Sequence, residues 1–184
     1  MIGSSEINRV IRDVLSPVLR ENGFSRVQAR NAWGWHDECI WVLNLRAVGS
    51  YFSAVTGWPP MSVEVQLGVY CEFLPPTSGR IKQDIKGELL PTESQCHEHY
   101  GLSCWLDQEA YTGRLDNPAE QKRSDLWWIE PDGSNLLAVV EDFKKSFLGE
   151  GLSWLKRNGS RKAIEDRQRE KEEFFRQFPE LRDL

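Results

Sequence analysis

The spacing of apolar and polar residues divides the chain into a helical start, a strand-rich middle and a helical end. The first apolar residues recur on one side of a helix: Ile7, Val10, Ile11, Val14, Leu15, Val18 and Leu19. This stripe predicts an amphipathic helix. Gly23 suits the left-handed position after its last turn, and Phe24 can then fold back on Leu19 as in a Schellman ending. We expect a kink at Pro17, because proline removes one helical hydrogen bond.

Residues 26–35, 39–48 and 62–74 alternate with the two-residue period of β-strands. In the third segment one row is apolar: Val63, Val65, Leu67, Val69, Cys71 and Phe73. The opposite row is mostly polar: Glu64, Gln66, Gly68, Tyr70 and Glu72. We therefore expect an antiparallel meander with its first row against helices and its second row facing outward.

Two long connections interrupt these strands, at residues 49–61 and 75–95. Connections longer than about 12 residues are often functional or disordered. A short helix could span Ile81 to Leu90 in the second connection. Residues 100–107 and 126–129 are candidates for a fourth and a fifth strand.

The last third of the chain is helical in pattern. Residues 135–157 carry apolar side chains at helical spacing, and Ser160 can cap a following helix that is dominated by charge. The sequence thus predicts an α+β fold: an antiparallel sheet of four to five strands with helices packed on one face, plus a charged C-terminal helix. We divide it into a single domain at 1–158 and a charged helical extension at 159–184.

Composition narrows the class of protein. The chain has 184 residues, of which 40% are apolar and 28% charged, and contains no long apolar run. It is therefore typical of neither a disordered chain nor a membrane protein. No secretory signal is visible at the start, so we expect a cytoplasmic protein whose four cysteines are thiols.

The net charge of −5 is unevenly distributed. Residues 61–120 hold ten acidic and four basic side chains. This balance argues against nucleic acid as a partner, because phosphate binding needs a concentrated basic face. It favours a basic protein partner. Nothing in the sequence sets an oligomeric state.

One group of side chains could hold a metal ion. Cys96, His97, His99 and Cys104 supply four possible ligands within nine residues. Their spacing matches none of the usual zinc patterns, so buried thiols and surface imidazoles are the favoured interpretation. We expect no metal and no cofactor, and the sequence identifies no catalytic residue.

The eight tryptophans are the unusual feature of the composition. Trp127 and Trp128 are neighbours, so in a strand they face opposite ways and cannot enter the same core. Trp58 lies in the 49–61 connection, and we expect it to be partly exposed. Exposed aromatic residues often anchor protein contacts, although the connection could instead pack onto the sheet. The binding residues we predict are Tyr51, Phe52, Trp58, Glu64, Tyr70 and Glu72.

Several short motifs resemble one group of small bacterial α+β domains of unknown function. They are Pro17 in the first helix, the Gly23-Phe24 pair, the Val65-Gln66-Leu67-Gly68-Val69 strand, and Trp127-Trp128 before a helix. The resemblance implies an intracellular protein without an assigned reaction. Related small families include immunity proteins, which neutralise toxins by binding them.

Two hypotheses follow. In the first, the chain is a non-catalytic protein-binding module, of the immunity or antitoxin kind. In the second, it is an enzyme with a dispersed polar site on the open face of the sheet. That site would use Glu64, Glu72, Arg46 or His99.

Overall fold

The protein is described by a computed structural model that covers residues 2–108 and 124–181. In these residues the centre is a six-stranded antiparallel sheet, in which β3 and β4 are the longest strands. Its strands are β1 (Arg26–Val27), β2 (Asn31–His36), β3 (Cys39–Ala47), β4 (Val63–Cys71), β7 (Glu98–Gly101) and β8 (Leu126–Trp127). They lie in the order β1-β2-β3-β4, and β7 and β8 both pair with the outer side of β4.

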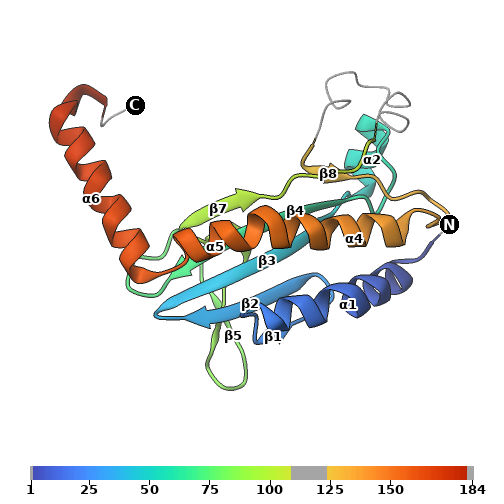
Figure 1. The fold of residues 1–184 in the computed structure, drawn as a ribbon, viewed down its shortest axis with the longest axis horizontal. Helices are drawn as coiled ribbons and strands as arrows, with labels where there is room; N and C mark the ends of the chain where they lie inside the picture. The colour runs from blue at the N-terminus through green and yellow to red at the C-terminus, as the bar shows by residue number, and fades with distance from the viewer. Residues whose placement is uncertain (1, 109–123, 182–184) are drawn as a thin grey trace.

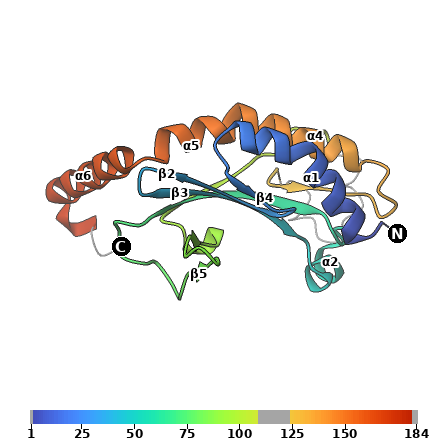
Figure 2. The ribbon, with the colours of Figure 1, turned by 90° about the horizontal axis from the view of Figure 1, so that it is seen from below.

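Helices cover one face of this sheet, and smaller elements lie on the other (Figures 1 and 2). The first face carries α1 (Ser4–Glu21), α4 (Leu136–Ser146) and α5 (Leu152–Asn158), with the π-helical turn η3 (Phe147–Gly151) joining the last two. The second face carries α2 (Ser50–Thr56), the hairpin β5 (Lys82–Gln83) and β6 (Leu89–Leu90), and the 3-10 turn η1 (Glu93–Gln95). The last elements are α6 (Arg161–Gln177) and the turn η4 (Pro179–Leu181). The predicted α+β class is confirmed, with one strand more than the four to five expected.

The first helix ends as its sequence predicts. Gly23 adopts a positive φ of 97°, and the amide of Phe24 donates to the carbonyl of Leu19 at 3.0 Å, which is the Schellman bond. The helix continues through Pro17. The chain that follows α1 approaches β2 closely: a Cβ on Gly34 would lie 2.1 Å from the carbonyl oxygen of Gly23. Glycine at this position therefore lets α1 lie directly on the sheet.

The helix-covered face holds the main core, and the predicted alternation builds it. The buried residues of the two central strands on this face are Cys39, Trp41, Leu43, Leu45, Val63, Val65, Leu67, Val69 and Cys71. Trp127 joins them with an exposed fraction of zero, edge-on to Phe143 at 4.8 Å between ring centres. Both rings are large apolar surfaces, so this contact anchors α4 to the sheet.

The sequence predicted that the opposite face of the sheet is open. This prediction is wrong, because that face carries two smaller apolar clusters. One contains Trp33, Ile40, Val42, Tyr70, Leu90 and Cys96. The other contains Val48, Trp58, Leu126 and Trp128. Trp127 and Trp128 thus face opposite sides of the sheet, as the two-residue period requires.

The structure adds one helix to these connections and corrects two expectations. The 49–61 connection contains the helix α2. Residues Ile81 to Leu90 form the β5–β6 hairpin, and no helix. The strand expected at 100–107 is β7, which ends at Gly101, and the chain beyond it is irregular.

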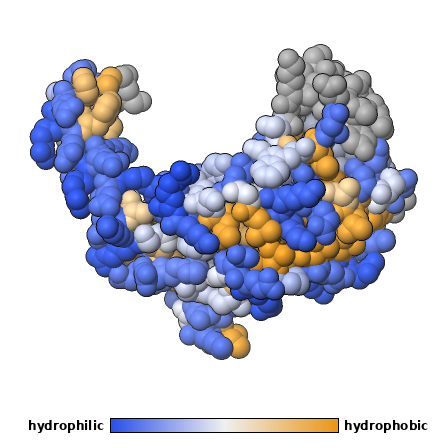
Figure 3. All heavy atoms as spheres, viewed as in Figure 1, coloured by the Kyte–Doolittle hydropathy of each residue, from blue (hydrophilic) through white to orange (hydrophobic). Residues whose placement is uncertain are grey.

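The charged helix α6 begins as predicted, with the Ser160 hydroxyl accepting from the amide of Ala163 at 3.3 Å. Ile164 is buried in the main core, and Arg161 and Arg167 pair with Glu38 and Glu98 beside the sheet, but α6 beyond these residues projects away from it (Figure 1). Apolar side chains gather at its far end, where Phe174 and Phe178 are exposed (Figure 3). Whether 1–158 folds as a domain without 159–184 stays a prediction. Among the described helices, none combines the length and apolarity needed to cross a lipid bilayer.

Candidate functional site

The aromatic residues predicted for binding in the 49–61 connection lie in or beside α2, and they differ in how far they are exposed to solvent. Tyr51 is 83% exposed, whereas Phe52 is half-buried. Trp58 has an exposed fraction of zero, so the prediction that it is partly exposed is wrong. Its ring contacts Trp128 at 5.0 Å between centroids. The segment packs onto the sheet because Trp128, which cannot enter the main core, offers it an apolar surface.

The acidic residues predicted for binding do not share one surface. The Glu64 carboxylate is mostly buried and accepts from Nε of Arg46 at 2.8 Å. Glu72 is exposed beyond the other end of β4, roughly 27 Å away at the rise of an extended strand. Tyr70 has only 4% of its surface exposed and contacts His97 at 5.0 Å between ring centres. Tyr70 was predicted to face outward, and it does, but the hairpin and η1 cover it.

The side chains named for the dispersed enzyme site do not converge either. Glu64 is paired with Arg46 at one end of β4, and Glu72 lies past the other. His99 lies on β7, with its Nδ1 2.8 Å from the carboxylate of Glu93. Arg46 and Glu64 therefore pair with each other, while Glu72 and His99 lie in other parts of the sheet.

The four possible metal ligands lie on both sides of the sheet. Cys96 packs on the second face, where a Cβ on Gly68 would come within 2.5 Å of its sulfur. Cys104 packs against the main core on the helix-covered face. The Nδ1 of His97 accepts from the amide of Cys71 at 3.0 Å. In the described residues no group of three or more ligands could hold a metal ion.

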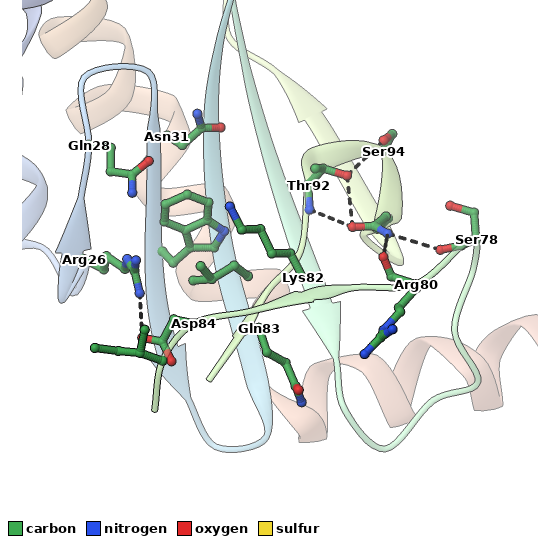
Figure 4. A pocket seen from close by; sticks show the side chains of 14 residues that line it. Arg26, Gln28, Asn31, Ser78, Arg80, Lys82, Gln83, Asp84, Thr92 and Ser94 are labelled. Carbon is green, nitrogen blue, oxygen red and sulfur yellow. Dashed lines mark hydrogen bonds and ion pairs between the residues drawn. The ribbon is translucent and has the colours of Figure 1, made fainter. Parts of the chain in front are cut away.

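A cleft of about 900 Å³ lies on the second face of the sheet. It lies between strands β1 and β2 on one side and the β5–β6 hairpin with η1 on the other (Figure 4). Polar side chains form most of its lining: Arg26, Gln28, Asn31, Ser78, Arg80, Lys82, Gln83, Asp84, Thr92, Ser94 and Gln95. None of these residues was predicted as a site from the sequence.

The floor of the cleft is apolar and fixed. Trp33 and Leu90 form it, and each has 7% of its surface exposed. The Nε1 of Trp33 donates to the carbonyl of Pro91 at 2.8 Å, so the indole from β2 also holds the chain that leaves β6. A ligand in the cleft would meet a flat ring surrounded by hydrogen-bonding groups.

One end of the cleft is closed by an ion pair. Nη1 of Arg26 lies 2.6 Å from the carboxylate of Asp84, whose side chain is only 8% exposed. The same carboxylate accepts from the amides of Lys86 and Glu88. Burial by itself raises the pKa of Asp84, but the two amides and the Arg26 guanidinium outweigh it and lower the pKa below its usual value. Asp84 thus fixes the hairpin turn and ties the turn to β1.

The wall opposite β1 is also preformed. The carboxamide of Gln95 accepts from the amide of Thr92 at 3.0 Å, which completes a capping box at η1. Its nitrogen donates to the carbonyls of Ser78 and Arg80. One side chain therefore holds three points of the loop in place.

The charge of the cleft is opposite to that of the whole chain. Its lining contains Arg26, Arg80 and Lys82 but a single carboxylate, Asp84, which Arg26 neutralises. Neither Arg80 nor Lys82 has an ion-pair partner in the described part of the chain. Figure 4 shows the Lys82 side chain extending from the hairpin over the cleft. The arrangement can hold an anionic group above an aromatic floor.

One sequence signal could have revealed the hairpin that builds this cleft. Asp84 to Gly87 carries aspartate first and glycine fourth, which is typical of a type I turn. Gly87 takes a positive φ of 83°, and its amide donates to the carbonyl of Asp84 at 3.1 Å. This is the three-residue hairpin loop closed by a glycine bulge.

In comparisons with protein-family models, with curated proteins and with solved structures, nothing matches the chain.

Proposed function

We propose that this chain is a non-catalytic protein-binding module that holds an acidic segment of a partner protein in the cleft between the sheet and the β5–β6 hairpin. The observation that carries the proposal is the pair of cations, Arg80 and Lys82, at the rim of a polar cleft without carboxylate partners of their own among the described residues. Charge-assisted hydrogen bonds to carboxylates are about twice as strong as neutral ones.

The shape of the cleft favours an extended segment of polypeptide. Its volume of about 900 Å³ lies at the upper end of the range for small-molecule sites, and the cleft is open to solvent rather than enclosed. The amide side chains of Gln28, Asn31 and Gln83 line it as well. Such groups can hydrogen-bond to a peptide backbone while the cations take its carboxylates.

Rigid walls support binding in another way. The Arg26–Asp84 ion pair and the Gln95 hydrogen bonds hold both sides of the cleft before any ligand arrives. A preformed site loses little conformational entropy on binding. A module of this kind acts by covering its partner, which is also the action expected of a protein of the immunity or antitoxin kind.

The proposal revises the sequence hypothesis in the charge of the partner. A basic partner was expected from the acidic middle of the chain, but Glu64 is paired with Arg46 and Glu72 lies far from it. The enzyme hypothesis is not retained, since Glu72 and His99 do not join the Arg46–Glu64 pair in one site. We therefore favour an acidic partner.

A titration tests the proposal directly. A fluorescein-labelled peptide of alternating glutamate and glycine is titrated with the full chain, and its fluorescence anisotropy is followed. We expect the double variant Arg80→Ala with Lys82→Ala to bind about tenfold or more weakly, and the affinity to fall with added salt, since exposed charges are screened.

The matched control is Lys86→Ala, which removes a cation from the same hairpin but outside the cleft lining. It should bind like the parent chain. Equal binding by the parent and the double variant, or stronger binding of a lysine–glycine peptide, would contradict the proposal.

A further inference from the structure

A second feature of the structure is independent of the cleft: Cys39 and Cys71 are direct cross-strand partners at the end of the β3–β4 ladder. The next pair outward, Glu38 and Glu72, is hydrogen-bonded, with the amide of Glu72 donating to the carbonyl of Glu38 at 2.9 Å. The amide of Cys71 instead points away from β3 and donates to Nδ1 of His97. Because the two kinds of pair alternate in an antiparallel ladder, the cysteines occupy a non-hydrogen-bonded pair.

This kind of pair has the geometry that a disulfide needs. The Cα atoms of a non-hydrogen-bonded pair lie about 4.5 Å apart, within the range of about 4.4 to 6.8 Å seen for disulfides. Cys39 and Cys71 both point to the helix-covered side of the sheet. As the two members of one cross-strand pair on that side, they are direct neighbours. Joining them requires no rearrangement of the strands.

The position of the pair also gives a route for a reagent. Both side chains are buried, but they form the last pair of the ladder. The turn beside them, Asp37 and Glu38, is exposed and holds two non-glycine residues at positive φ. Glu72 on the other strand is exposed as well. Sheet ends open at little cost in free energy, and opening one pair would uncover both thiols.

We infer that Cys39 and Cys71 are a thiol modification site that forms a reversible intramolecular disulfide on exposure to a low-molecular-weight disulfide. The first step is attack by the Cys39 thiolate on one sulfur of the reagent, which forms a mixed disulfide and releases one reagent thiolate. The Cys71 sulfur then loses its proton to solvent and attacks the Cys39 sulfur, which releases the second reagent thiolate. Two protein thiols are oxidised, one reagent disulfide is reduced to two thiols, and the protons balance.

The environment distinguishes the roles of the two cysteines. The hydrogen bond from Cys71 lowers the pKa of Cys39, against burial and the nearby carboxylates of Asp37, Glu38 and Glu72, which raise it. The same hydrogen bond and burial raise the pKa of Cys71. Cys39 is therefore the attacking thiol, because the thiolate is the nucleophile. Cys71 follows once the mixed disulfide has formed.

The other two cysteines serve as internal controls. Burial raises the pKa of Cys96, and it raises the pKa of Cys104 to about 12. They lie on opposite faces of the sheet, so neither can reach the other. A chain oxidised as proposed keeps both of them as thiols.

The test is a thiol count on the full-length chain. The protein is equilibrated in glutathione buffers that run from fully reduced to fully oxidised, denatured, and labelled with a maleimide for intact-mass measurement. We expect four labels under reducing conditions and two under oxidising conditions, with peptide mapping that joins Cys39 to Cys71. The near-ultraviolet circular dichroism of the oxidised chain should keep its native signal.

Variants make the result specific. Cys39→Ala should form no intramolecular link, whereas Cys96→Ala with Cys104→Ala should still form it at the same glutathione ratio. Four labels in every buffer would overturn the inference, as would a link through Cys96 or Cys104. So would a glutathione adduct that persists on the parent chain, or a link that forms only in denaturant.

Discussion

The two faces of the sheet are built from the same strands but in different ways. On the helix-covered face, alternate residues of β3 and β4 form one continuous core under α1, α4 and α5. On the opposite face, the intervening residues form two separate clusters beneath α2 and the β5–β6 hairpin. Stability is therefore concentrated on the first face, while the second has room for a polar cleft.

This difference shows how one sheet can combine a rigid core with a binding surface. Long helices bury whole rows of side chains, and the buried apolar area dominates folding. Short elements such as α2 and the hairpin bury only single side chains and leave polar groups between them.

The helix-covered face should be the more sensitive to loss of one ring. We expect Phe143→Ala to lower the free energy of unfolding by about 3–5 kcal/mol, because a fully buried ring that contacts Trp127 is replaced by a cavity. Urea unfolding followed by circular dichroism measures this change. Leu137→Ala, on an exposed position of the same helix, should change it by less than about 0.5 kcal/mol.

Trp58→Ala tests the smaller cluster under α2. We expect a loss of about 3 kcal/mol, at the lower end for a buried aromatic residue, since the few surrounding side chains can relax into the space. Binding of the acidic peptide should not change in conditions where the variant is folded. Tyr51→Ala, 83% exposed on α2, is the control and should leave stability nearly unchanged. A stable Trp58 variant with impaired binding would restore the original interpretation of this residue.

Acid should loosen the cleft before it unfolds the core. The pKa of Asp84 is lower in the folded chain than the unfolded value of about 3.9. Its carboxylate therefore stabilises the hairpin fully above that value, and this stabilisation is lost as the pH falls through the lower folded-state pKa. The hydrogen-exchange protection factors of the hairpin amides should fall below about pH 4, ahead of those of the β3 and β4 amides.

Asp84→Asn separates the ion pair from the turn. It keeps an oxygen that can accept from the amides of Lys86 and Glu88 but removes the charge that pairs with Arg26. The hairpin amides of this variant should have lower hydrogen-exchange protection factors than those of the parent at neutral pH. These protection factors should change little further in acid. An unchanged hairpin in both conditions would mean that the ion pair does not hold the hairpin turn against β1.

The smallest effect concerns the start of α6. The Arg161 guanidinium lies 2.5 Å from the carboxylate of Glu38 and 4.8 Å from the ring centre of Phe73. These residues flank the cysteine pair. We expect Arg161→Ala to leave the unfolding midpoint nearly unchanged, because the ion pair is exposed, but to speed formation of the Cys39–Cys71 link severalfold. Arg169→Ala, farther along α6, is the control.

The sequence predicted the helix-covered face well because that face depends on periodicity. Rows such as Val63, Val65 and Leu67 alternate without interruption, and the stripe that begins at Ile7 fits a helix. The Gly23-Phe24 ending follows from local backbone chemistry. Such features depend on residues that are close together in the sequence, so they can be predicted from it.

The second face was predicted poorly because its elements are short and their packing is not local. The turn at Asp84 to Gly87 carries a hairpin signature, but β5 and β6 contain only two residues each, too few to show a period. Trp58 was expected to be exposed because it lies among glycine and proline, yet it packs against Trp128, seventy positions away. The cleft residues Arg26 and Lys82 are far apart in the sequence, and only folding brings them into one cleft.

The lengths of the strands have a consequence for self-association. The two nine-residue strands, β3 and β4, are interior to the sheet, while its outer strands β1 and β7 have two and four residues. A growing amyloid or a strand-exchanged pair needs a long row of unpaired backbone amides and carbonyls to template on. Within the described residues, each margin of this sheet offers only a short row. The arrangement protects the chain against edge-to-edge aggregation by keeping its most apolar strands away from the margins.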